Sequence, residues 1–410
     1  MKGRQANLAL VAFVSVLVLV LLFSGCGGGG TLTTASGWQW PRTLIITSGG
    51  GSGLAKYVSW TTMMEKDTGM SIRVVPEENS IQRFMSVQYG KAFLVKGGKR
   101  ELGNVIEATE GHAVRDGGPW QMRVVWIHAI SNSGIFVRGD SPIKTIYDIK
   151  PGIRWAVWSM QPTVLKVPMA IADWIQLPHD QIVWVNAGSY DGCARAVAEG
   201  RADIMFGFPT SPAIYEAAAA PGGIRFLDLN SDKDPEGAAR FRANDPAYAF
   251  GPILSGVPEA RGVWGTSGAT LEVTLDKSDP ELVYNFAKWL DTNYERYKDA
   301  FDTNEHMSID ALMNALERSM IPVHDGLIKY LKEKNLWTPA HDKRQATNIA
   351  AVTAWCNAYP EAIKLADSKG IKIDPTNEAW MNFWQDYQKE KHLPKIGLHQ
   401  SLTVDYVDNY

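Results

Sequence analysis

Few cysteines and almost no excess charge narrow what this 410-residue chain can be. Three cysteines are too few for a disulfide-stapled scaffold or a cysteine-rich zinc module. With 41 basic and 44 acidic side chains, the chain lacks the broad positive surface of a non-specific nucleic-acid binder, so no nucleic-acid partner is expected. The content of 45% apolar and 21% charged residues is that of a globular protein, and the length favours two domains.

Motifs for metal binding and catalysis are also missing. The eight histidines form no H-E-x-x-H motif or cluster, and no nucleophile stands beside a base in a known arrangement. No repeat of fixed period is visible, which argues against a solenoid or a propeller. We therefore expect no catalytic residue, no metal and no cofactor.

The amino-terminal apolar run, Leu8–Phe23, has 16 residues, short of the ~20 that span a bilayer. Lys2 and Arg4 precede it and Ser24-Gly25-Cys26 follows it, which is the order of an export signal. The segment resembles a bacterial lipoprotein signal covering residues 1–26, in which Cys26 becomes the lipidated first residue. An uncleaved signal anchor is the alternative. Both interpretations place the rest of the chain outside the cytoplasm, in the periplasm or on the outer face of the cell membrane, and residues 27–42 then form a flexible tether.

Strand-like and helix-like segments alternate through most of the remaining chain, which predicts an α/β fold with a mainly parallel sheet and helices on both faces. The predicted strands are Thr43–Thr47, Ser71–Val75, Met122–Ile127, Gly134–Arg138, Arg154–Trp158, Gln181–Val185, Ala202–Phe206 and Ala269–Leu275. The predicted helices are Leu54–Lys66, Thr163–Ile175, Asp191–Glu199, Glu281–Phe301, Ser308–Met320, His324–Glu333 and Arg344–Gly370.

This order suits two lobes, with the chain crossing between them near 140–150 and again near 269–275. We expect residues 43–145 plus 269–340 to form one lobe and residues 146–268 the other. Cys193 and Cys356 stand in alanine-rich helical contexts and are interpreted as small core residues, with a disulfide between them left open.

Residues 341–410 form a predicted helical extension that is rich in aromatic side chains. Its aromatic residues are Trp355, Trp380, Phe383, Trp384 and Tyr387. Packing of these side chains against a lobe is the favoured interpretation, and a docking surface for a partner is the alternative.

A glycine-rich turn follows the first strand and precedes the first helix. Its residues are Thr47, Ser48, Gly49, Gly50, Gly51, Ser52 and Gly53. Leu54 stands where both a dinucleotide-binding motif and a nucleophile elbow require glycine, and Ala55 stands where a phosphate loop requires it. What remains is a set of unhindered N–H groups and hydroxyls at a helix N-terminus, which attract an anion. The alternative is a tight turn that only joins strand to helix.

Three further turns provide candidate ligand contacts. Asn79 and Ser80 follow the second strand, at the sheet edge where open α/β sheets bind ligands, although helix capping explains Asn79 equally well. In the second lobe we expect contacts from two turns, with core packing and capping as the alternative. These candidates are Trp158, Ser159, Gln161 and Thr163 after one strand, and Phe208 and Thr210 after another.

The chain resembles the TAXI-type solute-binding proteins of tripartite ATP-independent periplasmic (TRAP) transporters. The resemblance runs from about Arg42 to Trp337. It is carried by Thr47–Gly53 with the following helix, Asn79, Gly200–Met205, Val283-Tyr284 and Ile321–Tyr330.

This resemblance implies a type II periplasmic-binding-protein-like fold, in which two hinged α/β lobes close over a small organic acid such as an amino acid or oxo-acid. It also implies delivery of that ligand to the integral-membrane subunits of a TRAP transporter. Desolvating a carboxylate is costly unless several hydrogen bonds replace water, and the predicted turns supply such donors. A ligand sensor or scaffold module is the alternative function, and an enzyme on the same fold is a weaker one.

Overall fold

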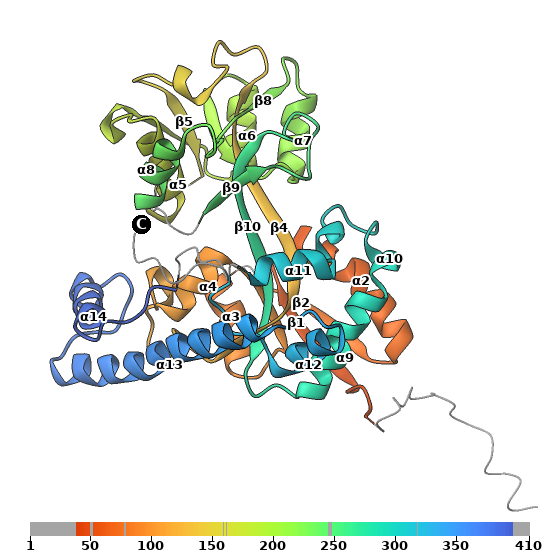
Figure 1. Cartoon of the computed structure of the whole chain (residues 1–410). Coiled ribbons are helices and arrows are strands. Elements are labelled where there is room, and N and C mark those ends of the chain that lie inside the picture. The colour runs from red at the N-terminus through yellow and green to blue at the C-terminus, as the bar shows by residue number, and fades with distance from the viewer. Residues whose placement is uncertain are drawn as a thin grey trace, which may run out of the picture.

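The computed structural model describes residues 38–396, except Gly50, Gly51, Glu78, Ser159, Gln161, 245–247 and Arg318. The side chains of Ser52, Pro162 and Thr163 are not described either. The predicted signal, Cys26 and residues 27–37 of the predicted tether therefore lie outside the described residues. Figure 1 shows two lobes joined by two long strands, with the C-terminal helices beside the lower lobe.

The first lobe is built on a five-stranded sheet in the order β2–β1–β3–β10–β4. Its strands are β2 (Ser71–Pro76), β1 (Thr43–Ser48), β3 (Leu94–Gly98), β10 (Trp264–Leu275) and β4 (Met122–Arg138). β1 pairs in parallel with β2 and β3, whereas β10 is antiparallel to both β3 and β4. β1 thus lies between the strands that follow it in the chain, and its carboxyl end is a topological switch point.

The second lobe repeats this order, with β6–β5–β7 in parallel and the far half of β4 between β7 and β8. Its own strands are β5 (Arg154–Val157), β6 (Val183–Asn186), β7 (Ile204–Gly207), β8 (Ile224–Leu227) and β9 (Ala249–Pro252), of which β9 pairs with β10. The two predicted strands Met122–Ile127 and Gly134–Arg138 are therefore one strand, β4. Ser131-Asn132-Ser133 looks like a loop in the sequence, but it stays in the strand because β10 pairs along it.

The chain crosses between the lobes within β4 and within β10, as Figure 1 shows. The first crossing therefore lies earlier than the sequence indicates, because residues 134–138 already pair with β7 and β8 of the second lobe. The second crossing, in β10, includes the predicted segment 269–275. Two antiparallel strands are the only β connection between the lobes among the described residues.

Thirteen helices of the α type cover the two sheets in the described residues. They are α2 (Ser52–Thr68), α3 (Ser80–Gln88), α4 (Lys99–Ile106), α5 (Pro162–Trp174), α6 (Tyr190–Ala198), α7 (Pro212–Ala219), α8 (Pro235–Asn244), α9 (Pro280–Thr292), α10 (Tyr294–Tyr297), α11 (Ile309–Leu316), α12 (Asp325–Glu333), α13 (Pro339–Ser368) and α14 (Glu378–Glu390). The predicted helix 281–301 is broken in two, because Asn293 leaves helical geometry and its side chain bonds back to the carbonyl of Trp289.

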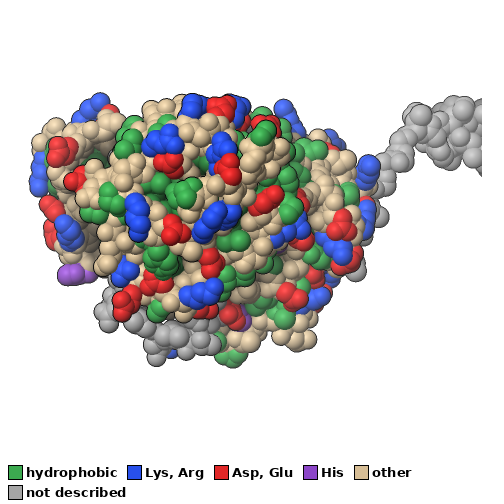
Figure 2. Space-filling model, turned by 90° about the horizontal axis from the view of Figure 1, so that it is seen from above, with side chains coloured by type: hydrophobic (Ala, Val, Ile, Leu, Met, Phe, Trp, Pro, Cys, Tyr) green, Lys and Arg blue, Asp and Glu red, His purple; other side chains and the backbone are tan. Residues whose placement is uncertain are grey.

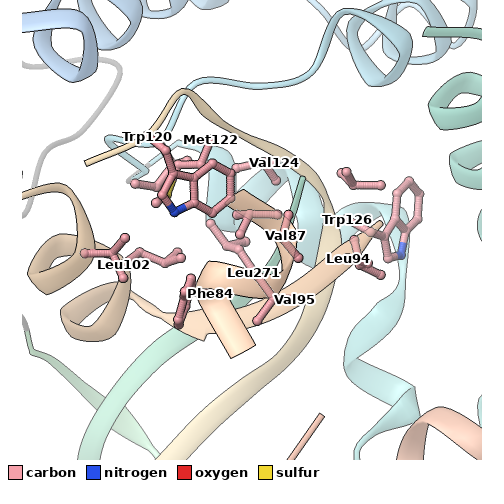
Figure 3. Packing of buried hydrophobic residues seen from close by; sticks show 14 of the residues in the cluster. Phe84, Val87, Leu94, Val95, Leu102, Trp120, Met122, Val124, Trp126 and Leu271 are labelled. Carbon is pink, nitrogen blue, oxygen red and sulfur yellow. The ribbon is translucent and has the colours of Figure 1, made fainter. Parts of the chain in front are cut away.

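The core of the first lobe gathers side chains from sheet and helices that are distant in the sequence. Figure 3 shows Phe84 and Val87 of α3, Leu102 of α4 and Val95 of β3 turned toward one another, with Leu271 among them. All five side chains are at most 4% exposed. This packing holds β3 and β10 firmly at the centre of the sheet, where both reach the space between the lobes.

The two cysteines of the described chain are free and belong to different cores. Cys193 is buried in the second lobe, and Cys356 is partly buried against the core of the first. Their interpretation as small core residues is confirmed, and no disulfide joins them.

The C-terminal extension packs on the first lobe. Trp355, Trp380 and Trp384 are at most 1% exposed, and they belong to the same buried cluster as the sheet residues. The Trp380 indole N–H donates to the carbonyl oxygen of Ala113 at 2.9 Å, so even the polar edge of this ring is satisfied within the lobe. Packing is therefore confirmed for these aromatic side chains, and the predicted fold class of two α/β lobes with a helical C-terminal extension is confirmed as well.

The surface carries no single dominant charge on the face seen in Figure 2, where basic and acidic side chains are interspersed. Among residues 38–396 that the structure describes, no helix is long and apolar enough to cross a membrane.

Candidate functional site

A cavity of about 430 Å³ lies between the lobes and is lined by both of them. The first lobe contributes the start of α2, the end of β3 and the loop before the 3₁₀ turn Asn304–Met307, while the second contributes the start of α6 and the turn after β7. The lining residues are Gly53, Lys56, Lys96, His128, Ala129, Ile130, Ser131, Asn132, Tyr190, Phe208, Thr210, Ser211, Ser255, Thr270, Phe301, Asp302 and Thr303.

The sheet order explains why the cavity lies there. The carboxyl ends of β1 and β3 point to one side of the first lobe, and the carboxyl end of β7 points to the facing side of the second. Open α/β sheets hold ligands at this edge, next to the switch point, because helix N-termini and strand-end loops meet there. Gly53 lines the cavity at the start of α2, next to the switch point of the first lobe.

Of the described residues in the predicted glycine turn, Gly53 lines the cavity and Thr47 does not. Gly53 lines the cavity, and the buried hydroxyl of Ser48 lies beneath it without a hydrogen-bond partner. A Cβ atom at Gly53 would lie 3.0 Å from Ser48 Oγ. Thr47 is different, because its hydroxyl donates to the carbonyl oxygen of Leu94 at 3.3 Å and is used within the sheet.

Three predicted members of the turn cannot be placed in full. Gly50 and Gly51 lie outside the described residues, as does the side chain of Ser52. Gly49 is described, and the nearest atom to a Cβ at this position would be Arg83 Nη1 at 3.8 Å.

Asn79 and Ser80, which were predicted to contact a ligand, are not among the residues that line this cavity. The Asn79 side-chain oxygen accepts hydrogen bonds from the backbone N–H groups of Ile81 and Gln82 and caps α3. Its side chain is exposed, since capping directs it along the helix rather than between the lobes. The Ser80 hydroxyl is engaged with the buried carboxyl of Glu101.

In the second lobe, the candidates Phe208 and Thr210 line the cavity, whereas Trp158 is not among the lining residues. The Trp158 ring is half-buried and packs against Tyr190 with ring centroids 5.7 Å apart. Trp158 therefore supports a cavity residue and does not itself line the cavity. Ser159 and Gln161 lie outside the described residues, and so does the side chain of Thr163.

Two lysines on the first-lobe side of the cavity were missed by the sequence analysis. Lys56 of α2 is 2% exposed, and its ammonium group donates to the carbonyl and hydroxyl oxygens of Thr303 at 2.7 and 2.8 Å. Lys96 of β3 reaches the N-terminus of α2, where a Cβ at Gly53 would lie 3.9 Å from its Cε atom. Burial lowers the pKa of Lys96, and it lowers the pKa of Lys56 to about 7.

A buried carboxyl group, Glu272 of β10, lies close to both lysines. Its two oxygens are 2.6 Å from the Tyr57 hydroxyl, which donates to it, and 2.5 Å from Nδ1 of His128. Glu272 is 1% exposed, and this burial raises the pKa of its carboxyl to about 7. Burial also holds the pKa of the His128 imidazole well below its usual value, so His128 adds no positive charge at neutral pH.

One unused hydrogen-bond donor belongs to a cavity-lining residue, and another lies buried next to the cavity wall. Besides the Ser48 hydroxyl, the amide nitrogen of Asn132 is buried without a partner, and Asn132 lines the cavity from β4. Buried polar groups are normally hydrogen-bonded, and an unpaired one in a cavity indicates a place for a ligand or for water. Together with two lysines and a helix N-terminus, these donors suit an anion.

The sequence carries a local signal for Lys96. Leu94–Gly98 ends in two glycines, and glycines also follow the first strand, so a lysine just before them stands near the carboxyl end of its strand. Neither Lys56 nor Glu272 shows a comparable local signal. Their proximity depends on β10 returning beside β3 from more than 170 positions later in the chain.

The remaining cavities lack this combination of groups. A second cavity of about 290 Å³ lies between β9, β10 and α11, and apolar side chains form most of its lining. Among the described residues, no group of three His, Cys, Asp or Glu side chains could hold a metal ion.

Comparisons with solved structures found matches at low sequence identity and low TM-score. The aliphatic sulphonate binding protein SsuA of Escherichia coli is 15% identical, with 90% of this chain and 96% of that chain covered and a TM-score of 0.37. The binding component of an ABC transporter from Wolinella succinogenes, complexed with lysine, is 11% identical, with 64% and 93% covered and a TM-score of 0.37. A search of curated protein sequences found no match. The sequence profile of the NMT1-like family matches residues 51–334, more than half of the chain.

Proposed function

This chain belongs to the NMT1-like family, and we propose that it is a solute-binding protein that captures a small organic anion, without turnover, in the cavity between its lobes. The observation that carries the proposal is that the cavity lining combines Lys56 and Lys96 of the first lobe with the unpaired amide nitrogen of Asn132. A carboxylate placed there would replace its lost water with the Asn132 amide and the two ammonium groups.

The arrangement supports capture over catalysis. Glu272 and His128, the residues most suited to proton transfer, are 1% and 3% exposed and are bonded to each other. His128 lines the cavity from the hinge strand β4, whereas Glu272 of the hinge strand β10 is not among the lining residues. Closure of the lobes about these two strands would complete the shell around a ligand and stabilise the closed state.

The proposal also includes a membrane anchor and a membrane partner. The resemblance to TAXI-type proteins supports delivery of the ligand to the integral-membrane subunits of a TRAP transporter, from a position anchored by lipid on Cys26. Fractionation of cells tests the anchor, since lipidated protein stays with membranes and a Cys26→Ser variant does not. Co-purification with a many-helix permease tests the partner.

Replacement of Lys96 by methionine is expected to weaken anion binding at least tenfold. Methionine keeps most of the apolar stem but removes the ammonium group from the N-terminus of α2. Isothermal titration calorimetry with acetate, glutarate, pyruvate and glutamate measures the affinities of the wild type and the variant. Lys91→Met, at an exposed position three residues before β3, is the matched control and should change no affinity. Equal affinities of all three proteins, or no binding of any anion, would argue against the proposed function.

Anion affinity is expected to fall as the pH rises through about 7. Over this range Lys56 loses its proton and Glu272 becomes charged, because burial brings the pKa of each to about 7. Both changes make the charge of the cavity more negative. A bound anion therefore favours the protonated forms of Lys56 and Glu272, and anion binding takes up protons. Calorimetry should show a dissociation constant that rises about tenfold between pH 6 and pH 8. An affinity that rises with pH would contradict this assignment of charges.

A further inference from the structure

Two aromatic side chains, Tyr190 and Phe208, line the second-lobe side of the cavity beside Thr210, Ser211 and Ser255. Phe208 follows β7 and is 44% exposed although it lines the cavity. Its ring centroid is 5.8 Å from that of Tyr190, with the two rings tilted by 32°, and 6.4 Å from that of the buried Phe206. Trp158 supports Tyr190 from behind. The two rings form an apolar patch on the lobe opposite the one that carries the lysines.

The hydroxyl oxygen of Tyr190 is held by its own lobe. It accepts a hydrogen bond from the backbone N–H of Phe208 at 2.6 Å and another from the Ser211 hydroxyl at 3.4 Å. These contacts fix the Tyr190 ring relative to Phe208. They leave the Tyr190 O–H as a donor, and the ring lines the cavity next to Phe208.

Positive charge is confined to the opposite wall. Both lysines that line the cavity come from the first lobe, and among the described lining residues the second lobe contributes no lysine or arginine. A dicarboxylate spanning the cavity would therefore place its second charge against aromatic rings, where it would lose water without gaining a cationic partner. A ligand with charge at one end and an apolar ring at the other has complementary surroundings at both ends.

Resting on the proposed function, we propose that the ligand is an aryl-substituted organic anion, with its carboxylate held by the lysine side and its ring stacked on Phe208. Phe208 is then the residue that sets this preference. Aromatic rings favour offset-stacked or edge-to-face contact with another ring, which an aliphatic dicarboxylate does not provide. Closure of the lobes would bury the exposed part of Phe208 against the ligand.

Calorimetry with three acids tests this assignment: 3-phenylpropionate, butyrate and glutarate. We expect the wild type to bind 3-phenylpropionate at least tenfold more tightly than either of the others. Phe208→Ala should weaken 3-phenylpropionate binding about tenfold and leave butyrate within twofold, whereas Phe208→Tyr, which keeps the ring, should retain most of the affinity.

The outcomes separate this inference from the proposed function. Tighter binding of glutarate than of 3-phenylpropionate by the wild type would overturn the aryl preference while supporting anion capture. An equal loss for butyrate and 3-phenylpropionate in Phe208→Ala would overturn the stacking role in the same way. Failure of all three acids to bind would overturn both. The wild-type comparison decides the aryl preference even where a Phe208 variant does not fold.

Discussion

Replacement of Gly53 by valine is expected to abolish anion binding, with at least a hundredfold loss of affinity, while the fold is kept. A Cβ at this position lies 3.0 Å from the Ser48 hydroxyl and 3.9 Å from the Lys96 stem. Valine branches at that atom, so its methyl groups would occupy the space in which an anion meets the α2 N-terminus. The affinity for the tightest-binding acid, measured by calorimetry, is the readout.

Ala55→Val is the matched control, because Ala55 lies two residues further along the same helix at an exposed position. It introduces the same β-branched side chain into α2 and should leave the affinity unchanged. Binding by Gly53→Val at wild-type strength would mean that the ligand does not approach the start of α2. That result would remove the central geometric argument for the proposed site.

Replacement of Trp380 by alanine is expected to destabilise the protein by about 3–5 kcal/mol. The Trp380 side chain is fully buried between the extension and the first lobe, and its indole N–H bonds to Ala113. Its removal leaves a large cavity and an unpaired carbonyl oxygen. Since globular domains are stable by only ~5–15 kcal/mol, this is a large share of the total. Denaturant unfolding, followed by tryptophan fluorescence and circular dichroism, measures the change.

Leu365→Ala serves as the comparison in the same extension, because Leu365 of α13 is 44% exposed. Its loss should lower the free energy of unfolding only slightly. A Trp380→Ala variant as stable as Leu365→Ala would show that the extension contributes little to the first lobe. That result would favour the alternative interpretation, in which the aromatic side chains of the extension form a docking surface for a partner.

Much of the fold could be predicted because its signals are local. The run Thr43–Thr47 followed by glycines and an apolar helix pattern indicates strand, turn and helix without help from the rest of the chain. The strands β3, β8 and β9 were not predicted in this way. β8 and β9 have four residues each, and they are strands because β4 and β10 provide partners for them.

The candidate site was predictable only in part, for a related reason. Gly53, Phe208 and Thr210 follow strands directly, so their place at the sheet edge could be inferred. Asn79 satisfied the same criterion, but capping of α3 directs its side chain elsewhere. Spacing along the chain cannot distinguish a donor that faces the cavity from one that satisfies its own helix.

By itself, the sequence determined that this is a two-lobed α/β chain with glycine-rich and aromatic turns at the ends of its strands, because backbone propensity and apolar periodicity act over a few residues. Only the tertiary structure decided that Lys56, Lys96 and Glu272 meet beneath those turns, with the lysines on one lobe and the Tyr190 and Phe208 rings on the other. Charges separated by hundreds of positions interact only after the sheet has brought β3 and β10 side by side, and the low polarity of that interior then shifts their pKa values.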